Sequence, residues 1–249
     1  MTHISEVIIR IKQPFQKPGW IMTQTWEHLL FIHWAVSPEA LRGLIPNELE
    51  IDTYDGKAWI GILPFLLSGV RIRRMPTVPY TSAFPEINVR TYVKTKQKSG
   101  IYFLSLDASN PLITSIAKRW YRLPYFLADM QFATTMNRIE FESRRLRGNG
   151  QSVVFSGSYE PIGLPIHVKK GTLEHWLTER YTLFCQCGRS NQIFYADVYH
   201  EPWVLQQTKA QIRENTMTQR LSIPLGEQPD LSFYARGVQS YVWPITILG

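Results

Sequence analysis

The chain has 249 residues, a length that allows one large domain or two small ones and that can bury a sizeable core without disulfide staples. A hydrophobic content of 44% with 13% aromatic residues is typical of a globular protein and excludes an intrinsically disordered chain. The net charge of +7 comes from scattered Lys and Arg residues, without a zinc-finger spacing or a basic helix. We therefore expect no nucleic-acid partner; the milder inference is a preference for anionic small molecules.

The chain carries no sign of export or of membrane insertion. It does not open with the charged and apolar pattern of a signal peptide. The most apolar run, 59–70, is interrupted by Gly61 and Pro64 and is too short to span a bilayer. Cys185 and Cys187 are separated by one residue, a spacing that seldom suits a disulfide. The sequence predicts a cytoplasmic protein with reduced thiols and no membrane partner, and it leaves homo-oligomer formation open.

The first half of the chain is dominated by predicted strands. Apolar runs bounded by turn residues predict strands at 28–36, 48–53, 58–73, 84–93 and 101–108. A short helix is predicted after the first of them, because Ser37 suits the N-cap, Pro38 suits the first helical position and Gly43 ends the helix. Residues 1–25 lack strong periodicity and are expected to form an arm or an edge segment.

The second half predicts more strands with a few helices. Strands are predicted near 125–134, 137–144, 152–159, 181–187, 192–200 and 231–245. Helices are predicted from Asn110 to about Leu123, after Thr172, and as a polar helix over 207–221, with a loop at 161–165. Neither a repeat nor a linker is visible. We expect one α+β domain, residues 1–249, dominated by antiparallel sheet.

The predicted strand 84–93 carries the most suggestive polar pattern. Successive side chains leave a strand on opposite faces, so Glu86, Asn88, Arg90 and Tyr92 form one row. At about 3.3 Å per residue, Glu86 and Arg90 would lie about 13 Å apart, and a small ligand over Asn88 could touch both. The alternative interpretation is the solvated face of an antiparallel sheet.

Other candidate residues are more isolated. The six histidines do not pair as H-x-x-x-H, and no P-loop, G-x-S-x-G or G-x-G-x-x-G is present, so we predict no metal and no cofactor. His33 lies in an apolar strand and is either a core histidine or a ligand contact. Arg180 shares the apolar stripe of the helix after Thr172 and either points inward or extends from the helix end to solvent.

Several longer motifs resemble a known family. They are Trp26-x-x-Leu-Leu-Phe-x-His-Trp34, Asp55-Gly-x-Ala-Trp-Ile-Gly61, Pro64-Phe65, Phe84-Pro-Glu-Ile-Asn-Val-Arg-Thr-Tyr-Val93, Tyr102-Phe-Leu-Ser-Leu-Asp-Ala108, Leu173-Glu-His-Trp-Leu-Thr-Glu-Arg-Tyr181 and Glu214-Asn-Thr-Met217. These motifs, over roughly residues 20–245, resemble the YqjF-like family of uncharacterised bacterial proteins, in the acetoacetate decarboxylase-like superfamily. The resemblance implies a cone-shaped, mostly antiparallel β-barrel with a few short outer helices and an internal pocket.

The resemblance also indicates which residues of this sequence correspond to the catalytic residues of the decarboxylases. The superfamily's decarboxylases form a Schiff base through a lysine whose pKa is lowered by an adjacent lysine, as in acetoacetate decarboxylase itself. Their pocket glutamate matches Glu86, and their Gly-x-Pro-Lys-Lys segment resembles Arg122-Leu-Pro-Tyr-Phe126, where the lysine positions become Tyr125 and Phe126. Neither side chain can form a Schiff base, and the pair Lys169-Lys170 lies at a different spacing.

Two functional hypotheses follow. The first is a binding protein for a small carboxylate or carbonyl metabolite, with Arg90, Asn88, Tyr92, His33 and Arg180 as ligand contacts. The second is an enzyme, a lyase or a related one, that acts on small keto or hydroxy acids without a Schiff base. In the enzyme, Glu86 is the acid or base, Arg90 binds the anion, and Tyr125 donates a hydrogen bond to a ligand oxygen.

Overall fold

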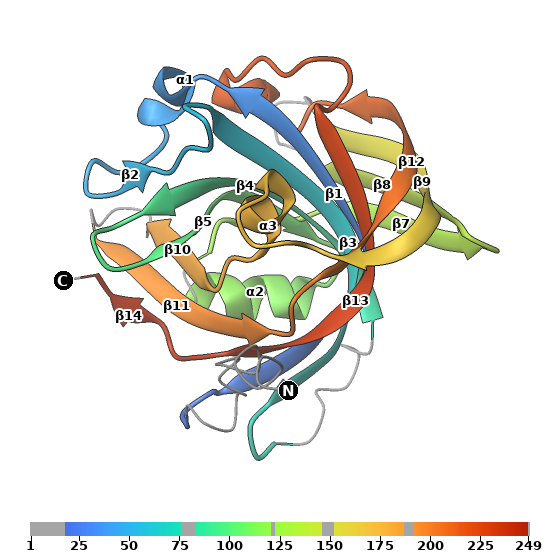
Figure 1. Ribbon diagram of the computed structural model, residues 1–249. Helices are drawn as coiled ribbons and strands as arrows, with labels where there is room; N and C mark the ends of the chain where they lie inside the picture. Colours follow the sequence, from blue (N-terminus) through green and yellow to red (C-terminus); the bar gives the residue numbers. More distant parts are fainter. Residues whose placement is uncertain (1–17, 76–82, 121–122, 146–151, 187–191, 249) are drawn as a thin grey trace, which may run out of the picture.

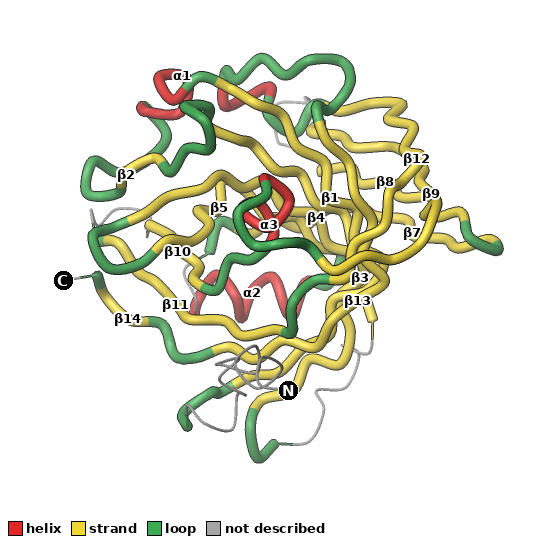
Figure 2. The backbone as a smooth tube through the Cα atoms, in the orientation of Figure 1, coloured by secondary structure: helices red, strands yellow, loops and turns green. Residues whose placement is uncertain are grey.

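The computed structural model describes residues 18–75, 83–120, 123–145, 152–186 and 192–248. The strands are β1 (Met22–Val36), β2 (Glu50–Ile51), β3 (Ala58–Ile72), β4 (Ala83–Lys94), β5 (Ser99–Ala108), β6 (Tyr125–Leu127), β7 (Asp129–Thr135), β8 (Arg138–Arg145), β9 (Val153–His167), β10 (Thr182–Gln186), β11 (Ile193–His200), β12 (Val204–Asn215), β13 (Leu231–Val242) and β14 (Thr246–Ile247). The α-helices are α1 (Pro38–Arg42), α2 (Pro111–Trp120) and α3 (Leu173–Thr178), and a 3₁₀ turn covers Gln219–Leu221. Strands thus make up most of the described chain, with few and short helices (Figure 2).

Part of the sheet forms a closed ring of strands. Its strand order is β14-β11-β10-β5-β4-β3-β1-β13-β12-β9-β8-β7, and an additional pairing joins β11 to β13 through Val198 and Val242. This pairing closes a ring of β11, β10, β5, β4, β3, β1 and β13, while β12, β9, β8 and β7 extend beyond it (Figure 1). All pairs are antiparallel except β5 with β10 and β5 with β6. The predicted antiparallel, partly barrel-like fold is confirmed.

The two larger hydrophobic cores of the described chain lie on the two faces of the ring strands, and a small third cluster of Ala196, Val198 and Val242 lies where β11 meets β13. The outer core contains Ile87 and Val89 of β4 and packs against β8 and β9; the inner core, inside the ring, contains Phe84 and Tyr92 of the same strand. Helices α2 and α3 also contribute to the inner core, through Ala117 and Leu177. Strand β4 is therefore buried on both faces, and its polar row cannot be a solvated surface.

Bulges in three ring strands keep apolar side chains directed into the ring. An extra residue interrupts the pairing of β1 at His28 (φ 54°), that of β3 at Gly69 (φ 60°) and that of β5 at Leu104. A bulge reverses the alternation of a strand beyond it. The inward positions change accordingly, from Met22, Gln24 and Trp26 to Leu29 and Phe31 in β1, from Leu63, Phe65 and Leu67 to Val70 and Ile72 in β3, and from Ile101 and Phe103 to Leu106 in β5.

The predicted N-cap of the first helix is confirmed, and a tight turn and an antiparallel pairing define the strands that follow it. Ser37 caps α1, because its Oγ accepts a hydrogen bond from the Ala40 amide at 3.3 Å. The turn before β3 has Asp55 and Gly56 at positive φ, as an Asp-Gly hairpin turn requires. Strands β4 and β5 pair antiparallel, with Glu86 opposite Ala108.

Three local predictions are wrong. The predicted polar helix 207–221 is largely strand β12, whose side chains alternate in exposure where it pairs with β9, so tertiary pairing overrides the local preference. The predicted loop 161–165 lies inside β9. Its two prolines are tolerated because, in the described chain, β8 pairs with β9 only as far as Tyr159 and the rest of that edge lacks a β8 partner. The predicted arm 1–25 already includes the start of β1 at Met22, and residues 1–17 lie outside the described ranges.

Two further expectations concern cysteines and membranes. Cys185 is buried, and Cys187 lies outside the described residues. None of the helices in the described ranges has both the length and the apolar character that a membrane crossing requires.

Candidate functional site

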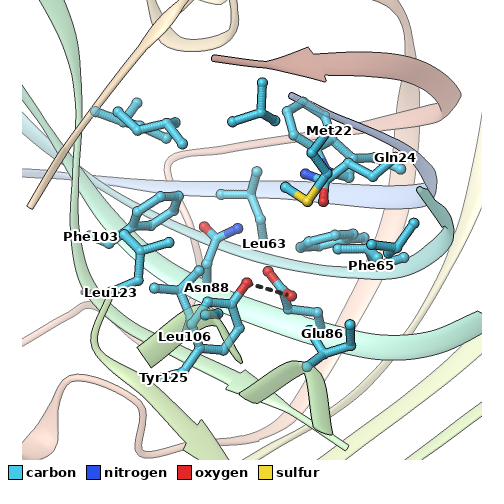
Figure 3. A pocket seen from close by; sticks show the side chains of 18 of the residues that line it. Met22, Gln24, Leu63, Phe65, Glu86, Asn88, Phe103, Leu106, Leu123 and Tyr125 are labelled. Carbon is cyan, nitrogen blue, oxygen red and sulfur yellow. Dashed lines mark hydrogen bonds between the residues drawn. The ribbon is translucent and has the colours of Figure 1, made fainter. Parts of the chain in front are cut away.

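A cavity of about 160 Å³ lies inside the ring. Five of its lining residues are polar or charged: Gln24, Glu86, Asn88, Arg90 and Tyr125. The others are apolar or aromatic: Ile21, Met22, Trp26, Leu29, Phe31, Leu63, Phe65, Leu67, Val70, Ile72, Ile101, Phe103, Leu106, Ile113, Ile116, Ala117, Leu123, Leu183, Trp203 and Val242. Figure 3 shows the Glu86 and Tyr125 side chains on one side of this space, with Met22 and Gln24 across from them.

The row predicted on β4 supplies most of the polar groups. Glu86, Asn88 and Arg90 occupy alternate positions of the strand, all line the cavity, and they expose only 3%, 6% and 8% of their surface. The fourth member of the row, Tyr92, is also buried but does not line the cavity. The structure thus brings three of the four predicted side chains to one cavity wall.

Glu86 and Tyr125 form a buried hydrogen-bonded pair. The Tyr125 hydroxyl donates to Glu86 Oε2 at 2.9 Å, as Figure 3 shows. Strand β6 places Tyr125 there because it pairs parallel with β5, where Leu106 is the partner both of Tyr125 and of Asn88. Burial raises the pKa of Glu86 to about 8; the Tyr125 hydrogen bond opposes the shift and the nearby Asp107 adds to it. At neutral pH the carboxyl therefore keeps its proton, and a protonated carboxyl can donate a hydrogen bond.

Arg90 brings a positive charge to the cavity. Its Nη2 donates to the Leu177 carbonyl of α3 at 3.3 Å, and its guanidinium lies 5.7 Å from the ring centres of Phe31 and Tyr92. Within the described chain, no carboxylate lies within 4.0 Å of this guanidinium, and its buried Nε has no hydrogen-bond partner. The Oδ1 atom of Asn88 is likewise buried without a protein partner among the described residues. The cavity wall therefore presents a cation and a hydrogen-bond acceptor that the surrounding protein leaves incompletely satisfied.

His33 lies behind this wall and does not line the cavity. Strand β3 places Gly61 between His33 of β1 and Arg90 of β4, and a Cβ atom on Gly61 would lie 3.1 Å from His33 Nε2. The same Nε2 is hydrogen-bonded to the Tyr92 hydroxyl at 2.8 Å. Burial, with a smaller contribution from the charge of Arg90, holds the pKa of His33 well below its usual range. His33 is a neutral core histidine that supports Tyr92.

Arg180 is held in an ion pair away from the cavity. Its Nη1 contacts Asp52 Oδ2 at 2.8 Å, and its Nε donates to the Trp176 carbonyl at 2.6 Å. The guanidinium also lies 4.2 Å from the ring centre of Trp176 and 5.2 Å from that of Tyr92. Arg180 does point into the interior, but it follows the end of α3, and its partner there is Asp52.

Lysines are not among the residues that line the cavity in the described chain. Lys169 and Lys170 are exposed in the segment before α3, and Lys118 is exposed on α2. Nor do the described residues contain a cluster of three or more His, Cys, Asp or Glu side chains that could hold a metal ion.

The sequence interpretation missed the opposite wall of the cavity. Gln24 and Trp26 of β1 line it, although Gln24 falls in the segment 1–25 that is predicted as an arm or edge, and Trp203 lies between two strands. Trp26 and Trp203 stack with ring centres 6.1 Å apart, and the Trp203 indole donates to the Thr178 carbonyl at 3.1 Å. The signal that could have found Gln24 and Trp26 is their own alternation with Met22, which extends β1 toward the N-terminus with a period of two.

This arrangement corresponds to a known class of structure. Acetoacetate decarboxylase from Legionella pneumophila superposes with a TM-score of 0.65 and 8% identity, over 93% of this chain and 88% of that one. An acetoacetate decarboxylase-like enzyme from Sphingomonas wittichii RW1 superposes with a TM-score of 0.63 and 11% identity, over 95% and 97% of the two chains. The enduracididine biosynthesis enzyme MppR, complexed with pyruvate, gives 0.61 and 11% over 93% and 91%. The protein therefore has an acetoacetate decarboxylase-like fold.

The sequence defines its place within that class. Residues 23–239 match the model of DUF2071, described as "Uncharacterized conserved protein", so the chain belongs to the DUF2071 family. "Uncharacterized protein YqjF" of Bacillus subtilis (strain 168) is 44% identical over 226 residues, which are 91% of this chain and 92% of that protein. The resemblance to YqjF-like proteins that the motifs indicated is confirmed.

Proposed function

We propose that the protein binds a small carboxylate or carbonyl compound in the inner cavity, without forming a Schiff base. The observation that carries this proposal is the buried row of Glu86, Asn88 and Arg90 along one cavity wall. An apolar cavity with a few converging polar groups is the usual form of a small-molecule site. MppR, which shares the fold, is complexed with pyruvate, and this supports the same class of compound here.

Each polar group has a definite part in this proposal. A carboxylate of the ligand pairs with Arg90, because a buried guanidinium without a counter-charge is costly and a charge-assisted hydrogen bond offsets that cost. A carbonyl or hydroxyl oxygen of the ligand accepts a hydrogen bond from the protonated Glu86 carboxyl, and the Tyr125 hydroxyl, 2.9 Å from Oε2, holds that carboxyl in place. Asn88, between them on the strand, offers its Oδ1 to a ligand donor.

The Arg90→Met variant tests the carboxylate contact. In a thermal-shift screen of short keto, hydroxy and aromatic acids, a ligand at a hundred times its Kd stabilises the native protein by about 2.7 kcal/mol. We expect Arg90→Met to weaken binding of the same acid by about 10- to 100-fold, because a hydrogen bond to a charged group contributes about 1.5 to 3 kcal/mol. Arg236→Met, at an exposed position of β13, is the matched control and should bind normally. Equal affinity in Arg90→Met would count against the assignment.

The absence of a Schiff base is tested separately. Such a step needs an unprotonated amine, and the residues that resemble the decarboxylase lysines are Tyr125 and Phe126. We expect borohydride treatment with acetoacetate or pyruvate to leave the mass of the protein unchanged. A reduced adduct mapped to Lys169, Lys170 or Lys118 would overturn this expectation and revive the decarboxylase mechanism.

The state of Glu86 favours a second candidate function, an enzyme on small keto or hydroxy acids. General acid–base catalysis is most effective when the pKa of the catalytic group lies near the working pH, and burial raises that of Glu86 to about 8. Glu86 would then move a proton to or from the compound that Arg90 orients. Recovery of a bound compound unchanged after long incubation supports the binding protein, whereas its conversion supports the enzyme.

A further inference from the structure

We propose that the ligand is a hydrophobic monocarboxylic acid of about six to eight carbons in all, larger than pyruvate or acetoacetate. This inference rests on the proposed function and narrows it, because it assigns the part of the ligand that does not touch the polar row. Three observations carry it: the composition of the cavity wall, its charge and its size.

The wall outside the polar row is almost entirely apolar. Eighteen of the lining residues are Ile, Leu, Met, Val, Phe or Ala, and two more are Trp. The bulges at His28, Gly69 and Leu104 are the reason that β1, β3 and β5 present apolar side chains to the cavity along their length. A two- or three-carbon acid on Arg90 would leave most of this surface without a partner.

The charge of the wall limits the ligand to one carboxylate. Arg90 is the single cationic side chain among the lining residues of the described chain, and Glu86 keeps its proton at neutral pH. A second carboxylate would have to lie among apolar side chains, where an unpaired charge is strongly disfavoured. A dicarboxylic acid of the same length should therefore be rejected.

The volume of the cavity limits the number of carbons in the apolar part of the ligand. A closed apolar cavity of about 150 Å³ is known to hold one benzene molecule. The present cavity, of about 160 Å³, therefore accommodates one ring or a chain of about six carbons beside the carboxylate. Because a buried methylene contributes about 0.8 kcal/mol, each carbon that fits should improve Kd by about fourfold.

The test is a calorimetric series on the full chain at pH 7. The probes are acetate, butyrate, hexanoate, octanoate, benzoate and 3-phenylpropionate, with adipate as the dicarboxylate matched to hexanoate. We expect affinity to rise from acetate to the six- to eight-carbon acids, and adipate to bind at least about 100-fold more weakly than hexanoate. A flat series, or adipate binding as tightly as hexanoate, would overturn the inference while leaving a carboxylate site. If no acid of any length binds, the proposed function itself fails.

A pair of variants locates the effect in the cavity. Ile116→Ala removes three carbons from a partly exposed cavity residue of α2, and Ile51→Ala removes the same atoms from a partly buried residue that packs on the outer core. The preferred chain length should increase by about two carbons in Ile116→Ala and stay unchanged in Ile51→Ala. Phe103→Leu, which enlarges the cavity by less, should increase it by about one carbon. A preferred chain length that changes in Ile51→Ala would contradict the assignment. So would a preferred chain length that changes in neither Ile116→Ala nor Phe103→Leu.

Discussion

Replacement of Glu86 by Gln is expected to increase the free energy of unfolding by about 3 kcal/mol at pH 7 and by about 4 kcal/mol at pH 8, with a limit of about 5 kcal/mol at higher pH. The reason is that burial raises the pKa of this carboxyl from 4.5 to about 8 in the native protein. The native site favours the neutral form, and Gln is neutral at every pH. The Gln side chain also keeps an oxygen that can accept the hydrogen bond from Tyr125.

The sign of the pH dependence follows from linkage. Below about pH 4.5 the Glu86 carboxyl is protonated in both the native and the unfolded chain, so its ionisation does not affect stability. Between about pH 4.5 and 8 the unfolded chain releases the proton and the native protein keeps it, so the wild type loses about 1.4 kcal/mol of stability per pH unit relative to the variant. Above about pH 8 both states are ionised and the difference is constant.

Urea denaturation of the wild type and Glu86→Gln at pH 5, 6, 7 and 8 measures this difference. The gap between the two free energies of unfolding should widen steadily over that range, while the dependence on urea stays similar. A gap of constant size from pH 5 to 8 would show that Glu86 is ionised in the native protein. It would then be a carboxylate paired with a cation, and the proton that the proposed function assigns to it would be absent.

The sequence predicted the polar wall because that wall depends on one strand. Alternation within 84–93 is enough to direct Glu86, Asn88 and Arg90 to one side, and the local composition is enough to make the segment a strand. The family resemblance then replaced the solvated-face interpretation with a pocket. Burial of both faces of β4, which decides between these interpretations, depends on strands far along the chain, such as β8 and β9.

The remaining parts of the site depend on contacts between distant residues. The ring is closed by Val198 of β11 pairing with Val242 of β13, and no local pattern specifies that register. Tyr92 continues the row of β4, yet other side chains of the inner core fill the space around it, so it contacts His33 and does not line the cavity. The assignment of β12 failed for a related reason: a polar segment with one side exposed carries little periodic signal, and its pairing with β9 decides its structure.

Arg180 shows the limit of such inference most clearly, because its inward direction is only one of the two alternatives that the sequence leaves open and its partner is not predicted at all. The carboxylate that it meets belongs to Asp52, 128 residues away in sequence. Lys94 lies 3.8 Å from the other oxygen of the same carboxylate, and its side chain is far more exposed than that of Arg180. Arg180 is therefore the principal counter-charge of Asp52, and its expected role is to fix the segment after α3 to the loop after β2.

Substitution of Arg180 by Met is accordingly expected to lower the free energy of unfolding by about 3 to 5 kcal/mol, the usual cost of removing one partner from a buried ion pair. In the protein, the pair has side-chain exposures of 5% for Arg180 and 11% for Asp52. The lost contacts also include the hydrogen bond to the Trp176 carbonyl and the packing of the guanidinium on the Trp176 ring. Urea denaturation at pH 7 measures the loss.

The double variant Asp52→Asn/Arg180→Met separates the ion pair from the packing, because it removes the unpaired carboxylate that the single variant leaves behind. It should be more stable than the sum of the two single variants predicts, by about 1 to 3 kcal/mol of coupling. The single variant Arg180→Met should still bind the acid whose affinity Arg90→Met weakens, since Arg180 does not line the cavity. When only the folded fraction of Arg180→Met is counted, its Kd for that acid should be within about twofold of the wild-type value. The opposite pattern, with unchanged stability and lost binding, would show that Arg180 contacts the ligand. The segment after α3 would then have to move when the ligand binds.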